Sequence, residues 1–219
     1  MTVPASSTYA FGIQFANIGA DKEFPVAKLV TVVPEKSSTV SGSSDQLQVW
    51  SMTEKKFKTY WNKKGKGWVL STATGSNTTD TVKNGDAVYF KRPSGTAGTV
   101  TVSGEVVKTT DGKISIPVTA NSTKFIANPW PVAFNIADLA TYVKDSKSST
   151  VSGSSDQVQV WDTEKKKYVM YWNKKSTGYV LSTNTSKVTT EKIFPGQGFM
   201  FKRPSGSDCV IEFPQPSGL

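Results

Sequence analysis

Polar and apolar residues alternate along a short segment near position 50, and this is the period of a strand with one face against a core. Residues 46–50 read Gln-Leu-Gln-Val-Trp. Residues 57–61 continue in the same style after a polar turn, and the glycine-containing segment 62–67 precedes a third apolar run at 68–70. These runs predict a meander of three consecutive antiparallel strands.

Further strands are predicted on both sides of this meander. Residues 87–91 follow an Asn84-Gly-Asp86 turn, and residues 99–102 lead on to a second apolar run at 106–107. We expect an opening strand near Val3 and a short helix at 136–143, with a weaker counterpart at 26–30. Six to eight short strands separated by turn residues predict an all-β fold, either an antiparallel β-sandwich or a partly open barrel.

Much of this pattern occurs twice. Residues 37–50 return as residues 148–161 with one difference, Leu47 against Val158. The same offset of 111 residues relates 60–64 to 171–175, 69–72 to 180–183 and 90–95 to 201–206. This period is too long for a solenoid repeat. It predicts two tandem homologous domains, residues 1–111 and 112–219, each of a common domain size.

The two copies end differently. Copy one ends in the strand-like segment 99–107, whereas copy two ends in Phe213-Pro-Gln-Pro-Ser-Gly218. Proline cannot donate to a sheet ladder and is confined to edges and strand ends. Copy two is therefore predicted to lack a full final strand. Its prolines either leave an edge open to pairing with another chain or block that edge.

Composition leaves the cellular location open. The start, Met1 to Ser7, has neither a positive segment nor an apolar one, so either the protein is cytoplasmic or Met1 replaces a removed signal peptide. No stretch approaches the roughly 18 to 20 apolar residues of a membrane span, so none is expected. The single cysteine, Cys209, is interpreted as a small buried side chain.

The chain contains no histidine, which removes the commonest general base and metal ligand. Only a carboxylate mechanism remains, with Asp45 and Asp156 or Glu54 and Glu164 as candidate pairs. The members of each pair are repeat counterparts or near-counterparts and are expected in separate domains, and Asp45 is expected to hydrogen-bond its own backbone at a strand start. No zinc, calcium, phosphate-loop or dinucleotide motif occurs. We therefore expect a protein that is not an enzyme and has no metal or cofactor.

Lysines dominate the formal net charge of +9 and occur in clumps. Lys63, Lys64, Lys174 and Lys175 each follow a Tyr-Trp-Asn segment. Interleaved aromatic and basic residues are typical of sites for polyanions or single-stranded nucleic acids. The alternative is that these lysines are solvated turn residues that discourage edge pairing. Other clumps occur at 55–56, 91–92, 165–167 and 202–203.

The six tryptophans allow a carbohydrate interpretation, because flat aromatic rings stack on sugars. Most of them fall where a sandwich core places large side chains. These are Trp50, Trp61 and Trp68, with Trp161 and Trp172 in the second copy. Trp130, in Asn128-Pro-Trp-Pro131, has no aromatic repeat partner and lies on a predicted loop. It is predicted to be the most exposed tryptophan and joins the four lysines as a candidate glycan contact.

Four segments of copy two together resemble a secreted bacterial β module. They are Phe125–Pro131, Ser155–Asp162, Tyr171–Trp172 and Pro195–Arg203. The module is of the type found in Verrucomicrobia and Lentisphaerae repeat proteins, and is more distantly similar to modules of Bacteroidetes surface proteins. Copy one departs from the pattern at Ile18 and Gly19 and at Ser51. The resemblance implies a mature secreted or cell-surface protein, and it transfers no catalytic residue.

These observations lead to one main functional hypothesis and two alternatives. The main hypothesis is an extracellular structural protein that assembles with further copies of itself into a filament or layer through β-edge pairing. The first alternative is a binding module for an anionic glycan or another cell-surface polyanion, held by the four lysines and Trp130, with nucleic acid a less favoured partner. The second, a carboxylate glycosidase, would need two acids about 5–10 Å apart in one cleft.

Overall fold

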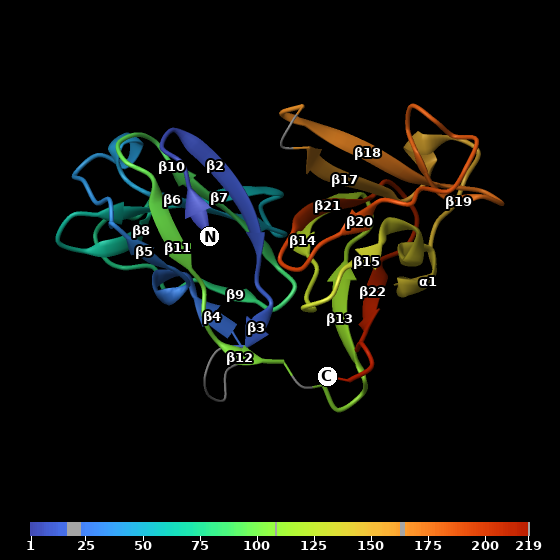
Figure 1. Cartoon of the computed structure of the whole chain (residues 1–219), viewed down its shortest axis with the longest axis horizontal. Helices are drawn as coiled ribbons and strands as arrows, with labels where there is room; N and C mark the ends of the chain where they lie inside the picture. Colours follow the sequence, from blue (N-terminus) through green and yellow to red (C-terminus); the bar gives the residue numbers. More distant parts are fainter. Residues whose placement is uncertain (17–22, 108, 163–164, 219) are drawn as a thin grey trace. The chain divides into compact units, whose positions relative to one another are not determined.

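The computed structural model describes residues 1–16, 23–107, 109–162 and 165–218. The chain divides into two compact units, Met1–Val107 (unit 1) and Lys108–Leu219 (unit 2), so the boundary lies close to the predicted one after residue 111. Antiparallel sheets make up nearly all of the regular structure, which confirms the all-β, sandwich-like fold (Figure 1). In the described part of the chain, no helix is long and apolar enough to cross a membrane.

Unit 1 contains a five-stranded and a three-stranded antiparallel sheet. The larger sheet has the order β2 (Ser7–Gly12), β10 (Ala87–Arg92), β6 (Gln46–Ser51), β7 (Lys56–Lys63) and β8 (Gly67–Leu70). The smaller has the order β1 (Thr2–Val3), β11 (Gly98–Thr101) and β5 (Thr31–Val33). The remaining elements are the pairs β3 (Phe15–Ala16) with β12 (Glu105–Val106) and β4 (Glu23–Pro25) with β9 (Thr81–Lys83), and the 3-10 turns η1 (Val26–Lys28) and η2 (Ser41–Ser43).

Unit 2 has the same arrangement of its two main sheets. The larger has the order β14 (Ser122–Ala127), β21 (Gly198–Arg203), β17 (Gln157–Asp162), β18 (Lys167–Lys174) and β19 (Gly178–Leu181). The smaller has the order β13 (Lys113–Val118), β22 (Cys209–Pro214) and β16 (Val143–Lys144). The remaining elements are the pair β15 (Phe134–Asn135) with β20 (Lys192–Ile193), the 3-10 turns η3 (Ile136–Asp138) and η4 (Ser152–Ser154), and helix α1 (Leu139–Tyr142).

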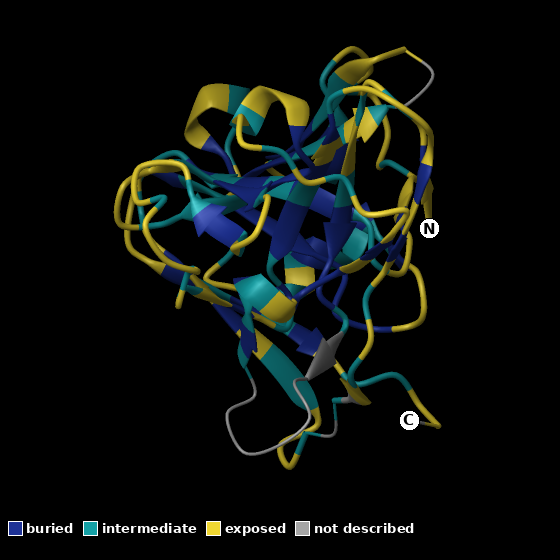
Figure 2. Cartoon of the chain, turned by 90° about the vertical axis from the view of Figure 1, so that its left-hand side faces the viewer, coloured by how far each residue is buried: buried dark blue, intermediate teal, exposed yellow. Residues whose placement is uncertain are grey.

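Strand alternation separates a core face from an outer face in each larger sheet, because successive residues of a strand point to opposite sides. In unit 1, Phe90 pairs with Leu47 between β10 and β6, and both side chains are fully buried. In unit 2, Phe201 pairs with Val158 in the same way. Figure 2 shows the resulting pattern, with buried residues on the strands and exposed residues mainly on the loops. Burial of these apolar faces is the main stabilising contribution.

The prediction of an incomplete final strand in copy two is wrong. The strand β22 has six residues and pairs along its whole length with β13 (Figure 1). On its other side, Val210 and Ile211 pair with β16. It is the central strand of its sheet, and Pro214 ends it. Pro214 is the last residue of a complete central strand and Pro216 follows it, so these prolines neither open nor block an edge there. Self-assembly thereby loses one of the observations that motivated it and stays a prediction.

Both arginines of the chain are buried. In the sequence they belong to the basic clumps at 91–92 and 202–203, for which solvent exposure is one of the two interpretations. Arg203 places Nη1 2.9 Å from Asp156 Oδ2, and its other nitrogens donate to the backbone oxygens of Asp145 and Ser207. Asp156 also accepts from the backbone N–H of Lys147. We call this arrangement the Arg–Asp clamp. It ties three segments together and gives a physical reason for the near-identity of residues 37–50 and 148–161.

The clamp in unit 1 is looser. Arg92 Nη1 lies 3.4 Å from Asp45 Oδ2, and Asp45 Oδ1 has no hydrogen-bond partner among the described residues. Asp45 therefore bonds Arg92 and the backbone of Lys36, nine residues earlier, rather than its own turn. In both clamps, burial raises the pKa of the aspartate although the backbone N–H and the arginine lower it. The dehydration of a buried charge is thus the largest influence on each carboxyl.

The two copies differ next to the clamp at one small residue. A Cβ on Gly98 would lie 2.1 Å from Arg92 Nη1, so the guanidinium occupies the space that a side chain would need. The counterpart 111 residues later is Cys209, which is buried as predicted. Burial raises the pKa of its thiol to about 11. Unit 2 therefore accommodates a side chain at the position where unit 1 requires glycine.

Buried tyrosines predict destabilisation at alkaline pH. Burial raises the pKa of Tyr171 to about 12, and it holds that of Tyr179 well above its usual value. Burial, with a hydrogen bond to Asp80, also raises the pKa of Tyr60. A tyrosine in the unfolded chain ionises near 10. Because the folded pKa is the higher one, this contribution to stability is complete below about pH 10 and is lost as the pH rises through the folded pKa.

Tyrosinate absorbance should accordingly rise in two steps during an alkaline titration. The second step should coincide with loss of the near-ultraviolet circular dichroism of the folded protein. Ionisation of all seven tyrosines near pH 10 with the dichroism intact would contradict the burial of these rings.

Candidate polyanion-binding site

The lysines nominated from the sequence lie at one end of the larger sheet in each unit. The strand β7 ends at Lys63 and β18 ends at Lys174. The next residues, Lys64 and Lys175, donate their backbone N–H groups to the oxygens of Ser38 and Ser149, which brings a serine-rich loop alongside. We call these regions the basic loop ends. They comprise Lys36, Lys63, Lys64 and Lys66 in unit 1, and Lys147, Lys174, Lys175 and Lys187 in unit 2.

Several ammonium groups of the basic loop ends are held by neutral oxygens. Lys63 Nζ donates to Thr74 O at 3.0 Å, and Lys174 Nζ donates to Thr185 O at 2.9 Å. The other such contacts are Lys36 to Ser94, Lys66 to Gly75 and Lys147 to Ser205. A carbonyl or hydroxyl oxygen positions an ammonium group without neutralising it, and a lysine keeps further donors for a ligand.

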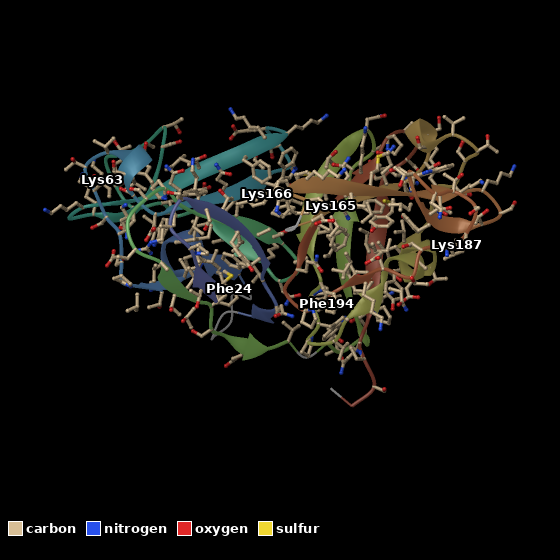
Figure 3. The ribbon with its side chains drawn as sticks, turned by 45° about the horizontal axis from the view of Figure 1, so that its top comes forward. Phe24, Lys63, Lys165, Lys166, Lys187 and Phe194 are labelled. Carbon is tan, nitrogen blue, oxygen red and sulfur yellow. The ribbon has the colours of Figure 1, made fainter. Side chains whose placement is uncertain are left out.

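Positive charge at the basic loop ends is not compensated by ion pairs. None of the eight lysines forms an ion pair within the described residues, whereas lysines elsewhere do, for example Lys113 with Glu212 and Lys165 with Asp162. The acids adjacent in the chain are Glu35, which accepts from Asn62, and Asp145. Figure 3 labels Lys63 and Lys187 at the two basic loop ends, with Lys165 and Lys166 at the opposite end of β18.

The aromatic neighbours of these lysines are not available to a ligand. Trp61 is 4% exposed and Trp172 is 5% exposed. Lys63 Nζ lies 5.9 Å from the centre of the Trp61 ring, a distance that suits a cation–π contact within the unit. The aromatic part of the predicted site is therefore structural. What the basic loop ends present to solvent is charge and hydroxyl groups.

The predicted exposure of Trp130 is wrong. Its side chain is 4% exposed, Nε1 donates to Phe213 O, and its backbone N–H donates to Asn128 Oδ1. The buried Asn128 side chain also donates to Val132 O, so the loop folds inward around it. Trp130 lines a pocket of unit 2 and is not a member of the basic loop ends.

The most exposed tryptophan is Trp161, at 39%. Its ring packs edge-on against Tyr168, with 5.1 Å between ring centres. The sequence held a signal for this position, because Trp161 is in phase with Gln157 and Gln159 on β17 and so shares the polar face of the strand. The prediction that Trp161 is a core residue is therefore wrong.

The candidate carboxylates do not form a reactive pair in the described structure. Asp45 and Asp156 are fully buried, and each is bound in the clamp of its own unit. Glu54 forms ion pairs with Lys56 and Lys58, and Glu164 lies outside the described residues. Within the described ranges, no group of three or more acidic or cysteine side chains is placed to hold a metal ion.

No protein-family model, curated protein or solved structure matches the chain. The resemblance to secreted bacterial β modules thus stays a prediction. What the chain does has to be argued from the basic loop ends themselves.

Proposed function

We propose that this protein is a non-catalytic binding module that holds an anionic glycan at its basic loop ends. One observation carries the proposal: each unit gathers four lysines that form no ion pair within the described residues, and neutral oxygens hold several of their ammonium groups in place. Sulfate or carboxylate groups on a glycan would supply the missing negative charge through charge-assisted hydrogen bonds. A secreted or cell-surface location is part of the same proposal.

Binding at such a site is electrostatic. The buried Trp61 and Trp172 rings leave no stacking surface there, so recognition depends on charge density rather than on the sugar face. Affinity should therefore fall steeply as salt is added, because added ions screen the lysines and reduce the gain from counterion release. Two basic loop ends in one chain would strengthen binding to a long polymer that reaches both.

Chromatography on immobilised heparin tests this proposal. The double variant Lys64→Ala with Lys175→Ala removes one exposed ammonium group from each basic loop end. We expect it to elute at clearly lower salt than the parent protein. The plot of log affinity against log salt concentration has a negative slope, and its magnitude should decrease by roughly one for each lysine contact that is lost.

The matched control is Lys56→Ala with Lys167→Ala. These lysines are also exposed and 111 residues apart, but they lie at the opposite ends of β7 and β18. Equal shifts for the two double variants would show that only net charge matters and would refute the assigned site. Weak retention on heparin with strong retention on single-stranded DNA would instead favour nucleic acid as the partner.

A further inference from the structure

Unit 2 contains a pocket of about 220 Å³ that is separate in its residues from the basic loop ends. Its walls come from the loop after β14, from β15, η3 and α1, from β20, and from the end of β22 with the residues that follow it. Phe134, Tyr142 and Phe213 form an aromatic cluster there, with ring centres 5.4–6.0 Å apart. Most ligand pockets for drug-sized molecules are roughly 300–1,000 Å³. This one suits a smaller molecule.

The pocket walls are fixed by buried hydrogen bonds. Asn128 is fully buried, and its Nδ2 donates to Val132 O at 2.7 Å and to Ile193 O at 3.2 Å, which joins two of the walls. Trp130 Nε1 donates to Phe213 O and joins a third. A pocket held in this way needs little rearrangement to bind, and preorganisation of this kind lowers the cost of binding.

Two opposite charges line the pocket without pairing. Asp138 Oδ2 accepts from the backbone N–H of Asn135 at 2.9 Å and from its Nδ2 at 3.2 Å, while Asp138 Oδ1 has no hydrogen bond within the described residues. Asn135 is also the ladder partner of Lys192, so Asn135 brings the carboxylate and the lysine into one neighbourhood. Lys192 makes no ion pair with any described residue. Asp138 and Lys192 thus line the same pocket, and neither charge neutralises the other.

We propose that this pocket binds a free α-amino acid with an apolar side chain. The ammonium group of the ligand pairs with Asp138, its carboxylate pairs with Lys192, and its side chain enters the cup formed by Phe134, Tyr142 and Phe213. A zwitterion supplies both missing partners at once, which a neutral sugar or a simple ion does not. Tyr142 also lines the pocket, and burial together with the nearby Asp138 raises the pKa of its hydroxyl.

The described residues of unit 1 do not repeat this chemistry. The strand pairing and the turn positions place Lys28, Thr31, Thr81 and Val102 where unit 2 has Asp138, Tyr142, Lys192 and Phe213. The carboxylate is replaced by a lysine, and two aromatic rings are replaced by smaller side chains. We therefore expect a single amino-acid site in the chain, located in unit 2.

Titration of the ¹⁵N-labelled full chain with L-leucine and L-phenylalanine tests the proposal. We expect saturable amide shifts confined to residues around the pocket. N-acetyl-leucine, leucine amide and glycine remove in turn the ammonium group, the carboxylate and the side chain, and each should bind at least about tenfold more weakly than the corresponding full ligand. Glucose serves as the neutral control and should cause no saturable shift.

Asp138→Asn and Lys192→Gln should each weaken binding of L-leucine at least about tenfold. Asparagine keeps an oxygen that can accept from Asn135, so the turn at η3 is retained. The control Lys167→Gln removes a charge of unit 2 outside both the pocket and the basic loop ends, and it should bind L-leucine like the parent. Absence of a saturable shift with both amino acids, binding of glucose, or unchanged affinity in the two pocket variants would overturn the proposal. Heparin retention of these pocket variants should be unchanged, so failure here is distinguishable from failure of the basic loop ends.

Discussion

Replacement of Arg203 by methionine is expected to destabilise unit 2 by about 3–5 kcal/mol, the usual cost of removing one partner of a buried ion pair. The substitution leaves the fully buried Asp156 carboxylate without its guanidinium partner. It also frees the backbone oxygens of Asp145 and Ser207, which Arg203 binds. Methionine fills much of the arginine volume, so the loss should come from polar groups left unpaired rather than from a cavity.

Urea unfolding followed by near-ultraviolet circular dichroism measures this loss. Lys202→Met is the matched control, since it removes the same charge from the adjacent residue, whose side chain lies on the outer face of β21. We expect this control to remain within about 0.5 kcal/mol of the parent. The double variant Arg203→Met with Asp156→Leu should recover part of the loss, because no buried charge then remains unpaired. Stability of Arg203→Met equal to that of the control would show that the clamp is not a stabilising centre.

Substitution of Gly98 by alanine is expected to destabilise unit 1 by about 1–3 kcal/mol, the usual cost of inserting an extra carbon into a packed core. The new Cβ would stand 2.1 Å from Arg92 Nη1, and the guanidinium cannot withdraw without losing its contacts to Asp45, Thr96 and Pro34. Because the clamp of unit 1 already has a long Arg–Asp contact, displacement of Arg92 should break it.

The corresponding substitution in unit 2, Cys209→Ala, is the internal comparison. It removes a small buried sulfur from a position that already accommodates a side chain, so we expect a loss of less than about 1.5 kcal/mol. Thermal unfolding of the two variants should therefore differ clearly, with Gly98→Ala the less stable. Similar transition temperatures for both would mean that Arg92 can move aside without cost.

The strands could be predicted because their signals are local. The segment from Gln46 to Leu70 carries both its alternation and its turn residues within reach of one another, and it forms β6, β7 and β8 as expected. The place of β22 could not be predicted in the same way. Its central position depends on pairing with β13 and β16, whose residues lie far away in the sequence. Prolines after a strand indicate where it ends but not which neighbours it has.

The candidate site was predictable in part for the same reason. Lysine clumps are visible in sequence, and Lys63, Lys64, Lys174 and Lys175 do lie together with other unpaired lysines. Burial of Trp61 and Trp172 depends on tertiary packing. Their unavailability to a ligand could therefore not be predicted from the alternation of aromatic and basic residues. The pocket of unit 2 could not be predicted, because its walls come from segments far apart in the sequence, within residues 128–142, 192 and 213–216. A signal was present in the departures of copy two from copy one at Asp138, Tyr142 and Phe213.

Titration of the ¹⁵N-labelled protein with a defined heparin oligosaccharide tests the proposed function most directly. The account predicts saturable amide shifts at Lys64 and Lys175 and at the adjoining residues Ser38 and Ser149. It predicts no comparable shifts at Lys56 and Lys167, at the other ends of the same strands. Shifts that are absent, or that are as large at Lys56 and Lys167 as at the basic loop ends, would contradict it.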